Sequence, residues 1–297
     1  MNFKSQETQQ KLRGGYYTPA TIANFLSQWA LVHQPQRILE PSCGDGQFLS
    51  AIHRQLNQGH GVAPAFVDAI ELFPQEAEKA KIAGERLRQF RTEVEIVNAD
   101  FFQWIDEVNG TEWEAIVGNP PYIRYQYFEK EQRAKAEKIF AQANVPFTKR
   151  TNAWVPFVIA SIMHLTPGGR LAMVIPAEIL HVQHANGLRL LLEQEMESVT
   201  LIHFRQIVFE NTLQGVVLLL ATKRHRAFKP LKQTKSTRLS IFAEQSEANL
   251  HIIDINDEND LPKLQVSHIL NGNGSTHPVW QGHWMLALLN ESKPSGL

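Results

Sequence analysis

The chain has 297 residues, a single cysteine and a formal net charge of −1 at pH 7. This length suffices for one large domain or for one domain with an appendage, and a lone Cys43 excludes an internal disulfide and a cysteine-built zinc site. The polar start of the chain and the lack of an apolar run of ~18 residues predict neither a signal peptide nor a membrane span. We therefore expect a cytoplasmic protein without a membrane partner.

Helical and extended patterns alternate along most of the chain. A first helix is expected with Thr18 as its N-cap and Pro19 in the first turn. Apolar residues at helical spacing predict further helices over 46–56, 74–89, 151–165 and 187–197. Short apolar runs predict strands over 37–41, 66–72, 94–97, 115–117, 170–175, 199–204 and 215–221.

This alternation is typical of an α/β, Rossmann-like fold. Strands that are separated by helices form a mostly parallel sheet with helices on both faces. Only a loop joins the last two predicted strands, so we expect them to pair as an antiparallel hairpin.

The chain changes character after the last predicted strand. The segment 239–255 predicts a small β addition, and the apolar segment 280–289 either docks on a partner or second copy, or packs on the sheet. Between 211 and 243 there is no acidic residue, and this basic strip suits either a phosphate backbone or a solvated hairpin edge. Its seven basic residues are Lys223, Arg224, Arg226, Lys229, Lys232, Lys235 and Arg238.

Two glycines follow the first predicted strand, immediately before a helix. Glycines at this point let the backbone approach a ligand, and the helix N-terminus favours a carboxylate or phosphate. The pattern matches neither a phosphate-binding loop nor the full dinucleotide motif, so an ordinary tight turn stays open. The segment is Glu40-Pro41-Ser42-Cys43-Gly44-Asp45-Gly46.

Acidic residues end the next two predicted strands. Glu71, followed by Leu72, is placed to accept hydrogen bonds from ribose hydroxyls. Asp100 is placed to accept from an adenine amine while Phe101 packs on the ring. Each residue taken alone is equally explained as a strand-end acid or a core aromatic.

The fourth predicted strand ends in Asn119-Pro120-Pro121-Tyr122, the most specific segment of the chain. Two prolines stiffen the backbone and leave carbonyls without N–H donors. The Asn119 side-chain oxygen and the Pro120 carbonyl can accept both hydrogens of a delocalised amine and direct its lone pair at a methyl donor. Tyr122 can stack on an extruded base. The competing interpretation is a plain Asx-Pro turn.

Over about 14–224, these segments together resemble the TaqI-like catalytic domain of gamma-class DNA adenine-N6 methyltransferases. The resemblance is carried by Gly15-Tyr16-Tyr17-Thr18-Pro19, by the glycine segment 40–46 and by residues 119–122. It implies a seven-stranded class I methyltransferase sheet and the cofactor S-adenosyl-L-methionine. It places the cofactor against Tyr17, Thr18, Glu40, Pro41, Ser42, Cys43, Gly44, Gly46, Glu71, Leu72, Asp100 and Phe101.

The resemblance also implies a DNA substrate. The catalytic segment it implies consists of Asn119, Pro120, Pro121 and Tyr122. Tyr122 and Phe209 are expected to contact a flipped adenine, and no metal is expected. The segment 123–150 has seven basic and three acidic residues, and the resemblance implies that it forms a loop and a helix that face DNA. Its competing interpretation is a charged surface helix over 129–142.

One departure from the family concerns length. We expect a catalytic domain over 1–225 and a small extension over 226–297, too short for the domain that reads the target sequence. We then expect the target sequence to be recognised by a separate specificity subunit, a second copy or a missing region. The expected function is site-specific adenine methylation in a restriction-modification or phage-defence system. The alternatives are methylation of a protein glutamine amide or an RNA base amine, and an inactive DNA-binding subunit.

Overall fold

The computed structural model describes residues 17–108, 110–123, 128, 130–148, 151–206, 208, 215–225, 249–264, 266, 269, 276–277 and 284. Their strands are β1 Arg37–Glu40, β2 Phe66–Glu71, β3 Glu93–Asn98, β4 Trp113–Gly118, β5 Leu165–Pro176, β6 Met196–Phe204, β7 Val216–Lys223, β8 Asn249–Ile255 and β9 Thr276–His277. Their α-helices are α2 Ala20–Leu31, α3 Gln47–Asn57, α4 Pro74–Glu85, α5 Phe101–Glu107, α6 Lys130–Gln142, α7 Trp154–Met163 and α8 Asn186–Glu195.

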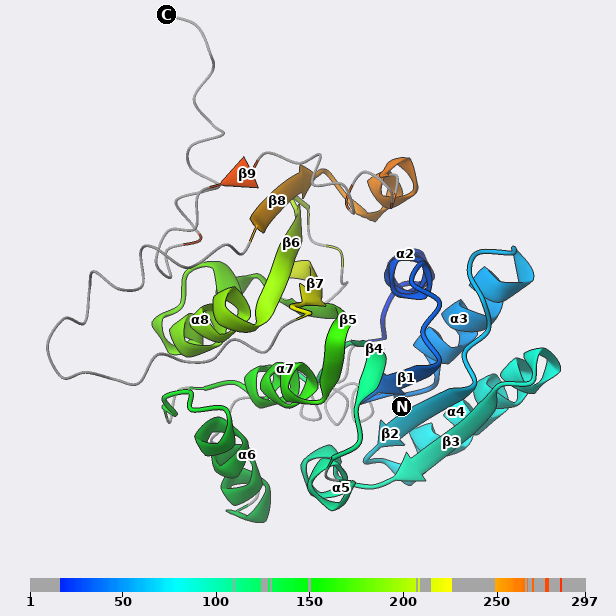
Figure 1. The fold of residues 1–297 in the computed structure, drawn as a ribbon, viewed down its shortest axis with the longest axis horizontal. Helices are drawn as coiled ribbons and strands as arrows, with labels where there is room; N and C mark the ends of the chain where they lie inside the picture. Colours follow the sequence, from blue (N-terminus) through cyan, green and yellow to red (C-terminus); the bar gives the residue numbers. More distant parts are fainter. Residues whose placement is uncertain are drawn as a thin grey trace, which may run out of the picture.

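The strands form one sheet in the order β3-β2-β1-β4-β5-β7-β6-β8-β9 (Figure 1). The first five strands pair in parallel, and β7 runs antiparallel to both β5 and β6. The expected α/β sheet with an antiparallel hairpin at β6–β7 is thereby confirmed. The expected seven strands are β1–β7, and β8 and β9 extend the sheet beyond them.

The two faces of the sheet bury separate apolar cores. Successive strand residues point to opposite faces, so Ile38 packs with α2, α3 and α4, whereas Leu39 packs with α5, α7 and α8. Strands buried on both faces read as continuous apolar runs. The helix α7 is the most enclosed, with nine of its ten residues buried, which confirms the helix expected over 151–165.

Two local expectations need correction. Pro19, not Thr18, occupies the N-cap position of α2, and no side chain caps that helix. The sequence also gave no prediction for α5, a short helix whose N-cap is Asp100. The Thr18 hydroxyl accepts from Asn119 Nδ2 instead of capping α2, whereas Asp100 takes the N-cap role that is common for its residue type.

The chain after residue 225 contributes to the same sheet. β8 lies parallel to β6 over seven residue pairs, which confirms a strand within the β addition expected over 239–255. Trp284, from the apolar segment 280–289, is 1% exposed and donates a hydrogen bond to Glu193 Oε1 on α8 at 2.9 Å. None of the described helices is long and apolar enough to cross a membrane.

Candidate active site

A loop with two left-handed glycines follows β1, and we call residues 41–46 the glycine loop. Gly44 and Gly46 have φ of +54° and +84°. A Cβ on Gly46 would lie 2.8 Å from Ala83 Cβ on α4, whereas a Cβ on Gly44 would have no neighbour within 4 Å. Gly46 is therefore required by packing between α3 and α4, and Gly44 leaves open space beside the backbone.

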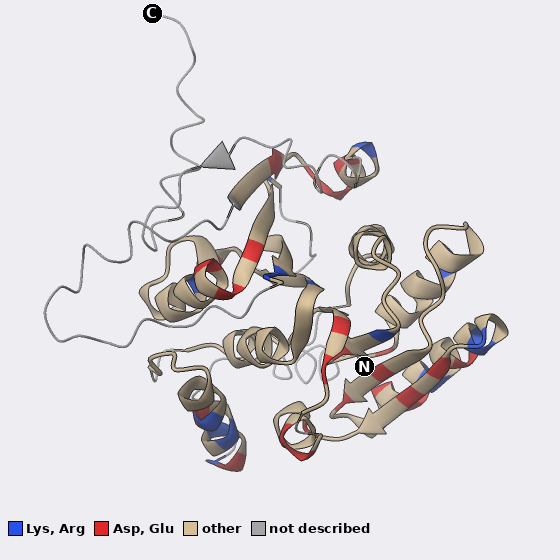
Figure 2. Ribbon diagram, in the orientation of Figure 1, with Lys and Arg blue, Asp and Glu red and all other residues tan. Residues whose placement is uncertain are grey.

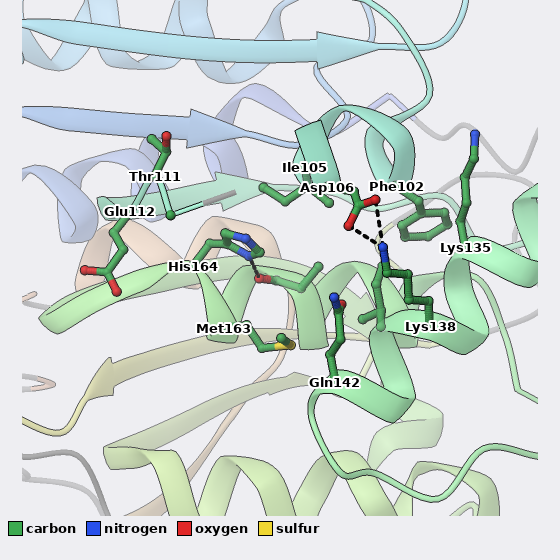
Figure 3. Close-up of a pocket in the computed structure, with 13 residues that line it drawn as sticks. Phe102, Ile105, Asp106, Thr111, Glu112, Lys135, Lys138, Gln142, Met163 and His164 are labelled. Carbon is green, nitrogen blue, oxygen red and sulfur yellow. Dashed lines mark hydrogen bonds and ion pairs between the residues drawn. The ribbon is translucent and has the colours of Figure 1, made fainter. Parts of the chain in front are cut away.

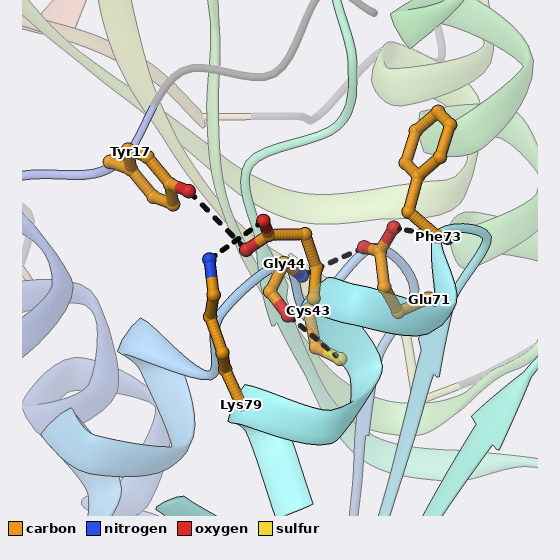
Figure 4. Close-up of polar contacts among 7 residues, drawn as sticks. Tyr17, Cys43, Gly44, Glu71, Phe73 and Lys79 are labelled. Atoms are coloured by element: carbon orange, nitrogen blue, oxygen red, sulfur yellow. Dashed lines mark hydrogen bonds and ion pairs between the residues drawn. The ribbon is translucent and has the colours of Figure 1, made fainter. Parts of the chain in front are cut away.

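Glu71, at the end of β2, closes this loop. One carboxylate oxygen accepts from Gly44 N–H at 2.9 Å and the other from Phe73 N–H at 2.8 Å (Figure 4). Burial raises the pKa of Glu71, and these backbone hydrogen bonds partly oppose the rise. Asn98, which the sequence analysis did not single out, donates to the Glu71 carbonyl at 2.8 Å and holds the ends of β2 and β3 together.

Glu40 is the most deeply buried acid among the described residues. It is 1% exposed, and its Oε2 has no hydrogen-bond partner among the described residues. Burial raises the pKa of Glu40 well above its ordinary value, and the nearby Asp45 and Glu71 raise it further. A buried acceptor without a partner destabilises the fold, so this atom is suited to a donor or cation that is not part of the chain.

Exposed apolar side chains border the loop. Tyr17 is 51% exposed and Leu72 45% exposed. The Tyr17 hydroxyl donates to Glu76 on α4 at 3.3 Å, and Lys79 contacts the same carboxylate at 2.8 Å (Figure 4). Burial, and then the charge of Glu76, raise the pKa of Tyr17. The start of the described chain is thus attached to the helix that follows Glu71.

Asn119 follows β4, the strand beside β1, and its partners include Thr18, Tyr122 and Ser42. Its Nδ2 donates to Thr18 Oγ1 at 3.2 Å, and its Oδ1 accepts from the Tyr122 hydroxyl at 2.8 Å. The Ser42 hydroxyl of the glycine loop donates to the Asn119 carbonyl at 3.2 Å. The structure therefore brings the expected residues from three separate segments to one edge of the sheet.

Tyr122 has a second acceptor within reach. Its hydroxyl lies 3.1 Å from the Val174 carbonyl on β5, in addition to Asn119 Oδ1. A hydroxyl has one proton, so it serves one of these acceptors at a time. The ring is consequently fixed beside Asn119, while the hydrogen bond to Oδ1 can be given up without leaving the hydroxyl unbonded.

Asp100 and Phe101 have clear structural roles at the end of β3. Asp100 Oδ1 accepts from the Gln103 N–H at 3.0 Å and caps α5. Phe101 is 4% exposed and stacks on Phe157 of α7, with ring centroids 4.9 Å apart. These positions lie at the same strand edge as Glu71, and nothing in them tests the expected contact with a cofactor adenine.

The helix α6 faces α5 with residues spaced three apart. Gln132 donates to Asp100 Oδ2 at 3.2 Å and Lys135 to Gln103 Oε1 at 3.0 Å. Farther along, the Lys138 ammonium lies 2.7 Å from Asp106 Oδ1. Figure 2 shows basic bands on α6 and acidic bands on α5. These contacts attach α6 to α5 through acids and amides of the chain itself.

A cavity of about 230 Å³ lies between α5, α6 and α7 (Figure 3). Its lining includes Glu112 and His164, which immediately precede β4 and β5. Asn119 follows β4, so the cavity opens at the opposite end of the strands from the glycine loop. In open α/β sheets ligands bind at the carboxyl ends, so the edge that carries Glu40, Glu71 and Asn119 is the candidate active site.

Some expected features lie outside the described residues. These are the position of Phe209, most of the basic strip, and part of the segment 123–150. The described residues contain no group of three or more His, Cys, Asp or Glu side chains arranged to hold a metal ion.

Known proteins resemble this chain in sequence and in fold. The family model of the N-6 DNA methylases matches residues 2–271. The Type II methyltransferase M.AccI of Acinetobacter calcoaceticus is 26% identical over 210 residues, covering 69% of this chain and 36% of the relative. M.HincII of Haemophilus influenzae is 22% identical over 255 residues, covering 84% of this chain and 43% of the relative. The chain thus spans less than half the length of these two relatives.

Solved structures share the fold at low sequence identity. A DrdV–DNA complex aligns with a TM-score of 0.68 at 14% identity, covering 94% of this chain and 32% of that one. A methyltransferase subunit of a type I restriction-modification system from Streptococcus thermophilus aligns with a TM-score of 0.60 at 18% identity, covering 92% and 57%. With the family model matching nearly the whole chain, this protein belongs to the N-6 DNA methylase family.

Proposed function

We propose that this protein transfers a methyl group from S-adenosyl-L-methionine to the N6 amine of an adenine flipped out of DNA. The observation that carries the proposal is the Asn119 carboxamide, held at the carboxyl end of β4 by Thr18 and Tyr122 and joined to the glycine loop through Ser42. A hydrogen-bond acceptor for an amine and a loop suited to a cofactor thereby lie side by side.

The residues around the glycine loop suit the cofactor. The partnerless Oε2 of Glu40 is suited to its ammonium group, and the open space at Gly44 allows close approach to the backbone. Tyr17, Thr18, Glu71, Leu72, Asp100 and Phe101 would complete the binding surface, as family membership leads us to expect. When bound, the cofactor supplies an electrophilic methyl group on a sulfonium centre.

The chain's own residues then activate the target amine. An aryl amine is a weak nucleophile because its lone pair is delocalised into the ring. Asn119 Oδ1 and the Pro120 carbonyl accept its two hydrogens and favour a pyramidal nitrogen, and the Tyr122 ring stacks on the base. The proton leaves after the methyl group has been transferred, so no strong base is needed beforehand. Phe209 remains a predicted second contact to the base.

Recognition of the target sequence requires more than the catalytic edge. We propose that residues 1–225 form the catalytic domain, whose sheet β8 extends, and that 226–297 begin a region completed by a specificity subunit, a second copy or further chain. Membership in a restriction-modification system follows the names of the similar proteins, among them a Type II methyltransferase and a methyltransferase subunit of a type I restriction-modification system. A role in phage defence is the corresponding biological prediction.

The test is to identify the methylated product. The intact protein is incubated with methyl-tritiated S-adenosyl-L-methionine and an equal mixture of unmethylated phage DNA, total RNA and a translation release factor. We expect label in N6-methyladenine after nucleoside digestion of the DNA. Label in the RNA or in a protein glutamine, or no label with a partner subunit present, would overturn the proposal.

A further inference from the structure

Thr18 contacts both the start of α3 and the catalytic asparagine. Its side chain is 5% exposed, and Oγ1 accepts the hydrogen bond from Asn119 Nδ2 at 3.2 Å. Its carbonyl oxygen accepts a second hydrogen bond, from Gln47 Nε2 at 3.1 Å. Gln47 is the first residue of α3 and follows the glycine loop directly. Thr18 therefore connects the cofactor side of the edge with the target-amine side.

We infer that Thr18 is a positioning residue that holds the Asn119 carboxamide for methyl transfer, in addition to any contact with the cofactor. This inference rests on the proposed function. The Thr18 hydroxyl holds the nitrogen end of the carboxamide and the Tyr122 hydroxyl holds the oxygen end. Contacts at both ends fix rotation about the Cβ–Cγ bond of Asn119, and thus the direction in which Oδ1 presents its lone pairs.

The helix α2 makes Thr18 a rigid support. Eight of its twelve residues are buried between the sheet and neighbouring elements. Near its far end, the guanidinium of the buried Arg170 on β5 donates to the Trp29 carbonyl at 2.5 Å and stacks over the Trp29 ring at 4.6 Å. A cation near a helix C-terminus also interacts favourably with the helix dipole. α2 is thus fastened to the sheet, and Thr18 precedes its first turn.

Removal of the Thr18 hydroxyl alone should slow methyl transfer. Thr18→Val keeps the shape of the side chain but cannot accept from Asn119 Nδ2. We expect the single-turnover rate at saturating cofactor and DNA to fall about five- to tenfold, the effect of one positioning hydrogen bond. Because this rate is measured at saturating cofactor, any loss of affinity for S-adenosyl-L-methionine, measured separately by calorimetry, does not contribute to it. Thr18→Ser, which restores the hydroxyl, should recover most of the rate.

Thr92→Val is the matched control. Thr92 is 2% exposed and donates to the Pro64 carbonyl at 2.8 Å, at the start of β3 and away from the site. The same chemical change there should lower the melting temperature but leave the transfer rate unaltered. If Thr18→Val leaves the saturated rate unchanged and weakens only cofactor binding, Thr18 is a cofactor contact and the inference is wrong.

A second measurement tests the positioning without any activity. In protein labelled with ¹⁵N-asparagine, the side-chain amide signal of Asn119 is assigned by its loss in Asn119→Ala. Thr18→Val should shift this signal and accelerate its exchange with solvent, and Thr18→Ser should not. An unchanged signal in Thr18→Val contradicts the inference, whereas a shifted signal in a protein that methylates no DNA upholds it and overturns only the proposed function.

Discussion

The carboxyl group of Glu40, at the end of β1, differs from the charged groups between α5 and α6 in whether the described chain supplies its partners. Glu40 is fully buried and its Oε2 has no partner among the described residues. By contrast, Lys138 and Asp106 neutralise each other at the surface, with about half of each side chain exposed. A surface ion pair contributes little to stability. A buried carboxyl group without a partner destabilises the fold unless a ligand supplies that partner.

The largest effect should come from the group that touches the target amine. Asn119→Ala removes the Oδ1 acceptor and should lower the single-turnover rate about 10²- to 10³-fold, since a preorganised polar group of this kind typically contributes that much. Glu40 and the glycine loop are unaltered, so calorimetry should show nearly unchanged cofactor affinity. Equal loss of binding and rate would instead make Asn119 part of the cofactor site.

The two loop glycines provide the next contrast. Gly46→Ala brings a methyl group against Ala83 and Ala80 at a positive φ, and should reduce the free energy of unfolding by about 2–4 kcal/mol. Gly44→Ala meets open space, so only the backbone cost of about 1 kcal/mol is expected. Chemical denaturation measures the free energy of unfolding of each variant. Because its added methyl enters the proposed ligand space, Gly44→Ala should weaken cofactor binding although it folds well; unchanged binding would place the ligand elsewhere.

The smallest effect is expected on the outer face. Lys138→Met breaks the pair with Asp106 and should cost less than about 1 kcal/mol of unfolding free energy, because exposed ion pairs contribute little. Denaturation at low and at high salt should show the difference disappear as the charges are screened. Cofactor affinity should not change, and a large loss of affinity would show that α6 supports the cofactor site.

The sequence predicted the sheet and the main site residues because their signals are local. Alternating apolar runs define strands such as β4 and β5, and the segment 119–122 is specific by residue type and order. The contacts between distant segments were not predictable in this way. The hydrogen bond between Thr18 and Asn119 joins residues 101 positions apart, and it depends on α2 lying across the end of the sheet.

Charge patterns were the least informative part of the sequence. The segment 123–150 is predicted to face DNA, and within it Lys135 and Lys138 also bind residues of α5. A run of charges does not reveal which neighbours the fold supplies. Similarly, the sequence placed Glu40 in the glycine segment, but its burial is known only from the structure.

Glu40→Gln tests the central claim, that the carboxyl edge is built around a cationic ligand. Folding raises the pKa of Glu40, so between the two pKa values the folded protein holds a proton that the unfolded chain releases. The free energy of unfolding therefore falls as the pH rises from the pKa of Glu40 in the unfolded chain through its pKa in the folded protein. Above that window, the ligand-free Glu40→Gln variant should melt about 2–4 °C higher than the parent, a gain of about 1 kcal/mol. Below the pKa of Glu40 in the unfolded chain, the melting temperatures of the two proteins should become equal.

The decisive measurement is calorimetric titration of both proteins with S-adenosyl-L-methionine over the same pH range. We expect the parent to bind more tightly as pH rises and Glu40 ionises, and the Glu40→Gln variant to bind at least about tenfold more weakly at the highest pH, with a flatter profile. Equal affinity of the two proteins, together with a lower melting temperature for Glu40→Gln, would contradict the account.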